Sequence, residues 1–119
     1  MVFSESLKKN QDFQNVYKNG KSYNNKYLLM YVLENNTSRN RLGISASKKV
    51  GNSVVRHRFA RFVRESYRLH ENIFNSGLDI VVVARKSAAS AGYAEIEEAL
   101  LHLSKLHHMI KIYFYDDEY

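Results

Sequence analysis

The sequence contains no cysteine, no proline and no tryptophan. The lack of cysteine excludes disulfides, thiolate metal ligands and cysteine nucleophiles, and it suits the reducing conditions of the cytoplasm. Uninterrupted apolar runs are short, and the first 11 residues lack the apolar stretch of a secretion signal. We therefore expect a cytoplasmic protein that does not associate with membranes.

Apolar side chains are plentiful by contrast. Hydrophobic residues make up 45% of the 119 residues, with six Phe and nine Tyr among them. This content excludes disorder caused by a shortage of apolar side chains. The length suits one domain, and no internal repeat or proline-rich linker divides the chain. We predict a single domain over residues 1–119.

Positive charge is concentrated in one part of the chain. The formal net charge is +6, yet residues 41–68 alone carry eight basic side chains and one acidic one, which leaves the remaining 91 residues near −1. A basic segment this localised indicates a polyanionic partner that is met by one face of the protein.

Six segments carry helical or strand periodicity. Helical spacing predicts helices at residues 7–17, 54–70 and 93–110. Strand-forming residues predict strands at residues 27–34, 41–50 and 78–84. The turn-forming residues 35–38 favour a hairpin between the first two strands. We expect strand 27–34 to be covered, because both of its faces are apolar, and strand 78–84 to lie centrally, because it is a β-branched run.

The predicted helix 54–70 divides into an apolar and a basic side. When the helix is turned by 100° per residue, six side chains fall within an arc of about 120°, and we predict that they form a buried stripe. They are Val55, Phe59, Phe62, Val63, Ser66 and Leu69. The solvent side gathers, within roughly 60°, His57, Arg61, Arg64 and Arg68. Arg56 and Arg58 flank this basic row.

Arginine is the only cation of this helix. Like charges three or four positions apart repel each other, so the basic row costs helix stability unless an anion neutralises it. The planar guanidinium pairs with phosphate oxygens through two hydrogen bonds, which favours phosphate recognition. An ordinary solvated cationic surface is the alternative interpretation.

The segment before the helix ends in two lysines and turns through Gly51. Backbone N–H groups at a helix start, together with Lys48 or Lys49, can bind a phosphate, and Asn52 can help to position a hydrated metal ion. A tight turn also requires glycine for structural reasons alone.

The segment Arg41 to Glu65, RLGISASKKVGNSVVRHRFARFVRE, resembles the signature of the protein component of bacterial ribonuclease P. The resemblance extends to DFQNVY at residues 12–17 and IVVVARK at residues 80–86, and covers roughly 100 of the 119 residues. It implies an α+β fold of order α-β-β-β-α-β-α, in which helices pack on a small four-stranded sheet. The implied fold, like that of the second domain of a small-subunit ribosomal protein, has a left-handed β-α-β crossover, whereas the general rule predicts a right-handed one.

The resemblance also implies function. The protein would bind the catalytic RNA of ribonuclease P and the 5′ leader of precursor tRNA, and promote Mg²⁺-dependent endonucleolytic removal of that leader. The RNA would carry out the hydrolysis and hold most of the Mg²⁺. The protein would be a monomer within the complex and would contribute no catalytic residue.

Individual residues take their expected roles from the same resemblance. The expected RNA contacts are Lys48, Lys49, Asn52, Arg56, His57, Arg58, Arg61, Arg64 and Arg68. The expected leader-binding cleft is formed by Phe13, Tyr17 and Tyr31, since bases stack on aromatic rings whatever their identity. Two positions depart from the family motif: His57 replaces an asparagine, and Ala60 replaces a lysine found in many members.

Alternative interpretations remain at this point. Phe13 and Tyr17 are also spaced as ordinary core residues. A ribosomal or RNA-chaperone binding module of similar fold would carry the same basic face without cleavage. A protein nuclease would need a carboxylate cluster or a histidine pair near that face, and the spacing of the five histidines provides neither.

Overall fold

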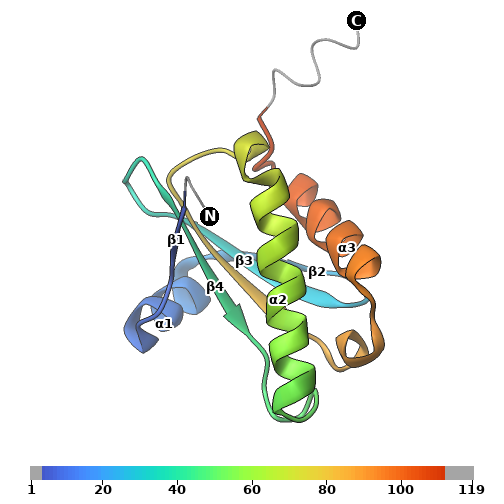
Figure 1. Ribbon diagram of the computed structural model, residues 1–119. Coiled ribbons are helices and arrows are strands. Elements are labelled where there is room, and N and C mark those ends of the chain that lie inside the picture. The colour runs from blue at the N-terminus through green and yellow to red at the C-terminus, as the bar shows by residue number, and fades with distance from the viewer. Residues whose placement is uncertain (1–3, 112–119) are drawn as a thin grey trace, which may run out of the picture.

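The computed structural model describes residues 4–111. Three α-helices and two short 3-10 helices surround one mixed five-stranded sheet of order β1-β4-β5-β3-β2 (Figure 1). The strands are β1 (Ser4–Ser6), β2 (Lys21–Asn24), β3 (Leu28–Glu34), β4 (Asn40–Ser45) and β5 (Leu78–Ala84). The helices are α1 (Asn10–Asn19), α2 (Ser53–His70), η1 (Glu71–Ile73), η2 (Lys86–Ser90) and α3 (Tyr93–Leu106). No helix among these described residues is long and apolar enough to cross a membrane.

The predicted α+β class is confirmed, and the sheet gains a strand. The three-residue strand β1 pairs in parallel with β4 and makes five strands where four were expected. Strand β4 ends at Ser45 rather than at Val50, because the chain then turns: the Val50 amide donates to the Ser47 carbonyl oxygen over 3.0 Å.

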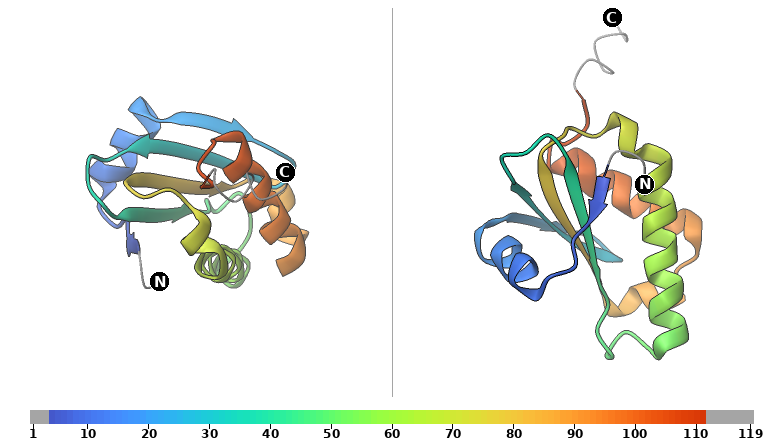
Figure 2. Two further views of the ribbon diagram at one scale, coloured as in Figure 1. Left: turned by 90° about the horizontal axis from the view of Figure 1, so that it is seen from above. Right: turned by 60° about the vertical axis from the view of Figure 1, so that its left-hand side comes forward.

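The predicted hairpin between β3 and β4 is wrong. Strand β5 lies between them, antiparallel to β3 and parallel to β4. A strand that is apolar on both faces belongs in the middle of a sheet, where helices or other elements cover each side. The connection from β4 through α2 to β5 is left-handed: with the helix toward the viewer and the strands pointing up, β5 lies to the left of β4 (Figures 1 and 2).

The sheet separates two apolar layers. Helix α1 covers one face, and α2 and α3 cover the other (Figure 2). Along β5, Ile80 and Val82 enter the larger core beneath α2 and α3, whereas Val81 packs with Val16 of α1 on the opposite face. The prediction that β3 is covered on both faces is confirmed by the same alternation, since Met30 and Tyr31 face opposite layers.

Helix α2 begins with a side-chain cap and is anchored by a buried stripe. The Asn52 Oδ1 accepts a hydrogen bond from the Val55 amide over 3.0 Å. Phe59, Val63 and Tyr67 are almost completely buried. The prediction that Leu69 is buried is wrong, since 51% of it is exposed. The buried stripe contains Tyr67 instead, which is completely buried.

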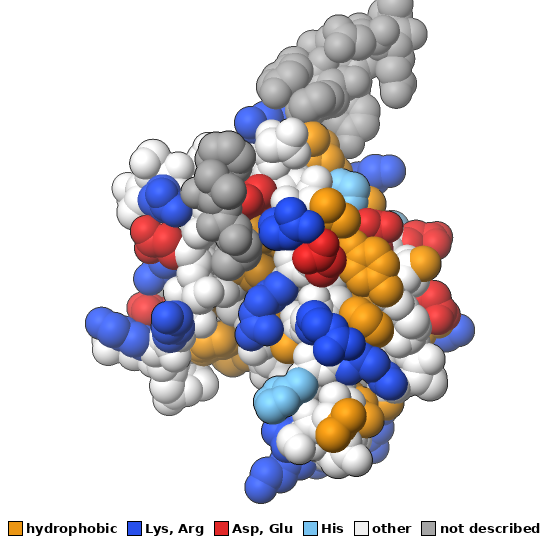
Figure 3. Space-filling view, viewed as in Figure 1, with side chains coloured by type: hydrophobic (Ala, Val, Ile, Leu, Met, Phe, Trp, Pro, Cys, Tyr) orange, Lys and Arg blue, Asp and Glu red, His pale blue; other side chains and the backbone are white. Residues whose placement is uncertain are grey.

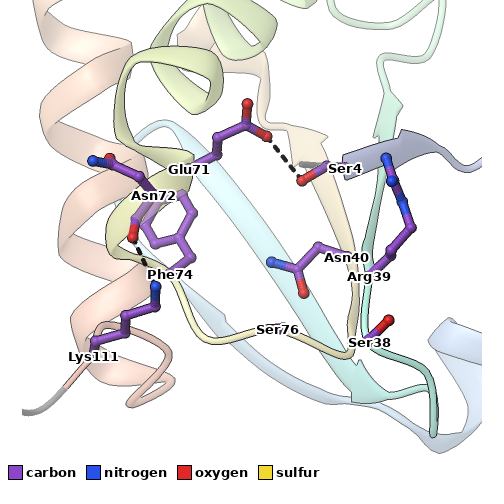
Figure 4. A pocket seen from close by; sticks show the side chains of 9 residues that line it. All are labelled: Ser4, Ser38, Arg39, Asn40, Glu71, Asn72, Phe74, Ser76 and Lys111. Carbon is purple, nitrogen blue, oxygen red and sulfur yellow. Dashed lines mark hydrogen bonds between the residues drawn. The ribbon is translucent and has the colours of Figure 1, made fainter. Parts of the chain in front are cut away.

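A buried polar network ties β1 to α2. The Ser4 hydroxyl oxygen lies 2.8 Å from the Tyr67 hydroxyl and donates to the Glu71 carboxylate over 3.0 Å. Asn40 donates to the Tyr67 hydroxyl from the other side, and burial raises the pKa of Tyr67. Figure 4 shows Ser4, Asn40 and Glu71 in the wall of a pocket at this end of the sheet. These contacts make the network a structural feature that fixes the rotation of α2.

A second polar contact stabilises the centre of the sheet. Arg41 on β4 donates to both carboxylate oxygens of Asp79 on β5, with N–O distances of 2.8 and 2.5 Å. Asp79 is nearly fully buried, and its hydrogen bond raises the pKa of the Arg41 guanidinium. Arg41 belongs to the basic segment by sequence, but it lies on β4 and its hydrogen bonds hold it to Asp79 and Asp12.

Replacing Arg41 with alanine should therefore lower the free energy of unfolding by about 3 kcal/mol, because a buried carboxylate loses its main partner. The matched control is Arg39→Ala, which removes an exposed ion pair with Glu5 whose N–O distance is 3.2 Å. That change should cost less than about 1 kcal/mol. Urea denaturation followed by circular dichroism measures both, and equal losses would contradict a structural role specific to Arg41.

The hydrogen bond by which Asn52 caps α2 should also contribute to stability. Asn52→Ala should cost about 1 kcal/mol of stability because the Val55 amide loses its acceptor, whereas Asn52→Ser should retain most of it. The same denaturation assay distinguishes the two variants. If serine proved as destabilising as alanine, the stabilising contribution of Asn52 would not come from capping.

Candidate nucleic-acid interface

The basic row predicted for α2 lies on the solvent side of the helix. His57, Arg61 and Arg64 are exposed, and the buried stripe containing Phe59 and Val63 holds the opposite side against the sheet. Figure 3 shows Lys and Arg side chains gathered along the exposed length of α2. The fold therefore presents these guanidinium groups together on one face.

One arginine of the row is paired within the helix. Arg68 donates to Glu65 through a contact of 2.5 Å, and both side chains are about half exposed. This hydrogen bond holds the pKa of Glu65 below its usual value and raises that of Arg68. Exposed ion pairs of this kind are weak, so a phosphate can replace the carboxylate at little cost.

Arg56 and Arg58 flank the row and are half-buried. The Arg58 Nη2 donates to the Ala89 carbonyl oxygen in η2 over 2.5 Å, which fixes this side chain between α2 and the segment before α3. The Arg56 Nε is buried and has no hydrogen-bond partner within the described part of the chain. Arg58 thus has a structural contact in addition to its predicted one with RNA.

The turn between β4 and α2 adds further cations. Lys48 and Lys49 are exposed, and Lys49 lines a hollow together with Arg85, Lys86 and Ser87. Arg85 also donates to the Asn25 carbonyl oxygen over 2.7 Å, which ties the end of β5 to the β2–β3 turn. Arg85 and Lys86 were not predicted as site residues from the sequence. The pattern that could have indicated them is the Arg-Lys pair directly after the central strand. Because β4 and β5 pair in parallel, their ends lie together, and this pair comes close to the lysines that follow β4.

The three predicted cleft residues form one aromatic cluster on the α1 face of the sheet. The ring centroids of Tyr17 and Tyr31 are 5.0 Å apart and nearly perpendicular, and those of Phe13 and Tyr17 are 6.3 Å apart. All three side chains are half-buried, so they contribute to the small core and also reach the surface. The ring and cation contacts found among described residues do not join Lys48 or Lys49 to this cluster.

A glycine on β4 makes room for the cluster. A Cβ atom at Gly43 would lie 2.7 Å from the Phe13 ring, which is closer than such contacts normally allow. The ring therefore rests directly on the backbone of β4. This close approach explains why a strand of the sheet carries a glycine opposite α1.

Two of the histidines, His70 and His107, make contacts that belong to the fold. His107 donates through Nε2 to the Met30 carbonyl oxygen over 2.9 Å, and burial lowers its pKa. His70 lies 3.2 Å from Glu97 across the interface of α2 and α3. Within residues 4–111, no group of three or more His, Cys, Asp or Glu side chains could hold a metal ion.

Comparison with known proteins gives one consistent result. The family described as Ribonuclease P matches residues 1–108. The Ribonuclease P protein component of Lachnoclostridium phytofermentans is 66% identical over 107 residues, which cover 90% of this chain and 92% of that protein. The corresponding protein of Alkaliphilus metalliredigens is 52% identical over 103 residues, covering 87% and 93% of the two chains.

Solved structures show the same fold. The RNase P protein of Staphylococcus aureus superposes with a TM-score of 0.84 at 36% identity, covering 91% of this chain and 99% of that one. The RNase P protein of Thermotoga maritima gives a TM-score of 0.78 at 32% identity, covering 85% and 96%. These similarities span most of the length of both compared chains. The family match also sets aside the alternative of a ribosomal or RNA-chaperone protein. The chain belongs to the ribonuclease P protein family, and it is the protein subunit of the ribonucleoprotein that matures the 5′ end of tRNA.

Proposed function

We propose that the exposed face of α2 binds the catalytic RNA subunit of ribonuclease P through its phosphates. The observation that supports this most strongly is the row of His57, Arg61, Arg64 and Arg68, which the buried stripe of α2 directs away from the protein. Glu65 is the only acid on this helix, and it is already paired with Arg68. Bound phosphates would relieve the repulsion between neighbouring guanidinium groups.

The aromatic cluster on the other face of the sheet supports a second contact. We propose that Phe13, Tyr17 and Tyr31 bind the 5′ leader of precursor tRNA by stacking on its bases. The rings are half-buried and oriented by one another, so little side-chain entropy is lost when a base stacks on them. Stacking is tolerant of base identity, which suits leaders of different sequence.

The two surfaces lie on opposite sides of one sheet, so a single monomer could hold the catalytic RNA and the substrate leader together. The hydrolysis itself would belong to the RNA subunit, whose Mg²⁺ would supply the charge stabilisation for phosphodiester cleavage. The protein's own contribution is to bind and orient the leader and to neutralise phosphates. Its place of action would be the cytoplasm, where a bacterial precursor tRNA is transcribed.

Arg61→Ala should weaken binding to the catalytic RNA and reduce the slope of log affinity against log salt concentration by about 0.7–0.9, the contribution of one phosphate contact. Arg61 is the informative choice because it is exposed and makes no hydrogen bond within the described protein. Filter binding over a series of KCl concentrations measures the slope.

Lys105→Ala is the matched control, since Lys105 is an exposed cation near the end of α3 and away from the basic row. It should leave the slope as in the wild type. A slope that is unchanged in Arg61→Ala, or changed equally in both variants, would contradict the assignment of α2 as the RNA-binding face.

Phe13→Leu should weaken the binding of leader-containing precursor tRNA to the reconstituted complex by about 5- to 100-fold, the loss expected for one stacked base, and leave mature tRNA unaffected. Leucine preserves apolar packing beneath α1. Tyr23→Leu serves as the control, because Tyr23 packs in the layer on the opposite face of the sheet. Equal losses for precursor and mature tRNA would count against a leader site.

A further inference from the structure

An aromatic pair that no role described above uses lies where α2 packs against α3. Phe62 on α2 and Tyr93 at the start of α3 meet edge to face, with ring centroids 5.8 Å apart at 79°. Both side chains are half-buried. Leu69, 51% exposed, continues the apolar surface two helical turns further along α2. Figure 3 shows an apolar patch between the cationic row of α2 and α3.

Cations border this patch closely. The Arg61 guanidinium carbon lies 5.7 Å from the Phe62 ring centroid, so the patch continues directly into the basic row. Arg58, about one helical turn before Phe62, is held by its hydrogen bond to the Ala89 carbonyl oxygen. A ring pair beside guanidinium groups combines a stacking surface with phosphate-binding donors, which is the combination that unpaired nucleic acid requires.

The two acids beside this aromatic pair, Glu65 and Glu97, already have partners within the protein. Glu65 is paired with Arg68, and Glu97 accepts a hydrogen bond from the Tyr93 hydroxyl over 3.2 Å and lies 3.2 Å from the His70 Nε2. Arg61 makes no hydrogen bond or ion pair within the described residues. The charge left over at the edge of the patch is therefore positive, and it complements an anion rather than another apolar helix.

We propose that Phe62 and Tyr93 form a stacking platform for one unpaired nucleotide of the catalytic RNA, whose phosphate is bound by Arg61. The proposal rests on the proposed binding of that RNA to α2 and adds a contact of a different chemistry to it. A base on this platform would give the protein a direct contact with an unpaired base, which a row of phosphate contacts alone does not supply.

The absence of tryptophan from the chain allows a direct test. Phe62→Trp introduces a single tryptophan into the platform, and Phe62→Leu preserves the apolar contact with α3 but removes the ring. Leu69→Ala is the matched control, because it removes an exposed aliphatic side chain from the same flank. Affinity for a transcript of a bacterial ribonuclease P RNA is measured with the full-length protein at two salt concentrations.

The platform predicts that Phe62→Leu loses at least about five-fold in affinity with an unchanged salt slope, because no phosphate contact is removed. Leu69→Ala should bind as the wild type does. Phe62→Trp should keep wild-type affinity, and its fluorescence should be quenched as the RNA is added, since a base stacks on the indole. These results support the platform even if Phe62→Leu alone proves poorly folded, because the tryptophan variant reports independently.

Other outcomes overturn the proposal. If the RNA binds but tryptophan fluorescence stays constant, or if Phe62→Leu binds as the wild type, the platform is wrong while the arginine face stands. If the wild-type protein fails to bind the RNA, the proposed function fails and the platform with it. A protein dimer that forms without RNA and is abolished by Phe62→Leu would show that the patch is covered by a second copy instead.

Discussion

Everything on the outer face of α2 depends on how its inner face is held. Phe59, Val63 and Tyr67 are buried against the sheet, and the hydroxyl of Tyr67 is bonded by Ser4 and Asn40. Rotation of the helix about its axis would bury a guanidinium or expose one of these side chains, and both are costly. The apolar stripe therefore determines where the positive charges point, although it makes no contact with an RNA itself.

The central position of β5 places the two surfaces proposed to bind RNA on opposite sides of the sheet. Its apolar side chains alternate between a layer under α2 and α3 and a layer under α1, so each face of the sheet supports a different element. One element carries guanidinium groups and the other carries aromatic rings. Ionic contacts bind phosphates regardless of sequence, and rings bind unpaired bases regardless of identity. This difference is the reason why we propose the catalytic RNA for one surface and the single-stranded leader for the other.

Local patterns in the sequence revealed more of the site than of the sheet. The 100° period placed Arg61 and Arg64 on the solvent side, and the charge map located the basic helix, because both properties depend on neighbours in the chain. The hairpin error had a non-local cause: β5 joins the sheet between two strands that are close in sequence. The polar strand β1 gave no periodic signal, so the contact of its Ser4 with Tyr67 of α2 could not be predicted. Lys86 was missed because parallel pairing brings it toward Lys49 only in the folded protein.

If the exposed face of α2 binds the catalytic RNA, its arginines are covered when that RNA binds. Phenylglyoxal modification of arginine side chains, followed by mass spectrometry of the protein with and without the RNA transcript, tests this directly. Arg61 and Arg64 should be reactive in the free protein and protected in the complex, whereas Arg39, at the far end of β4, should stay reactive in both. If Arg61 and Arg64 remained reactive in a complex that had formed, the RNA would be bound elsewhere and the account would be wrong.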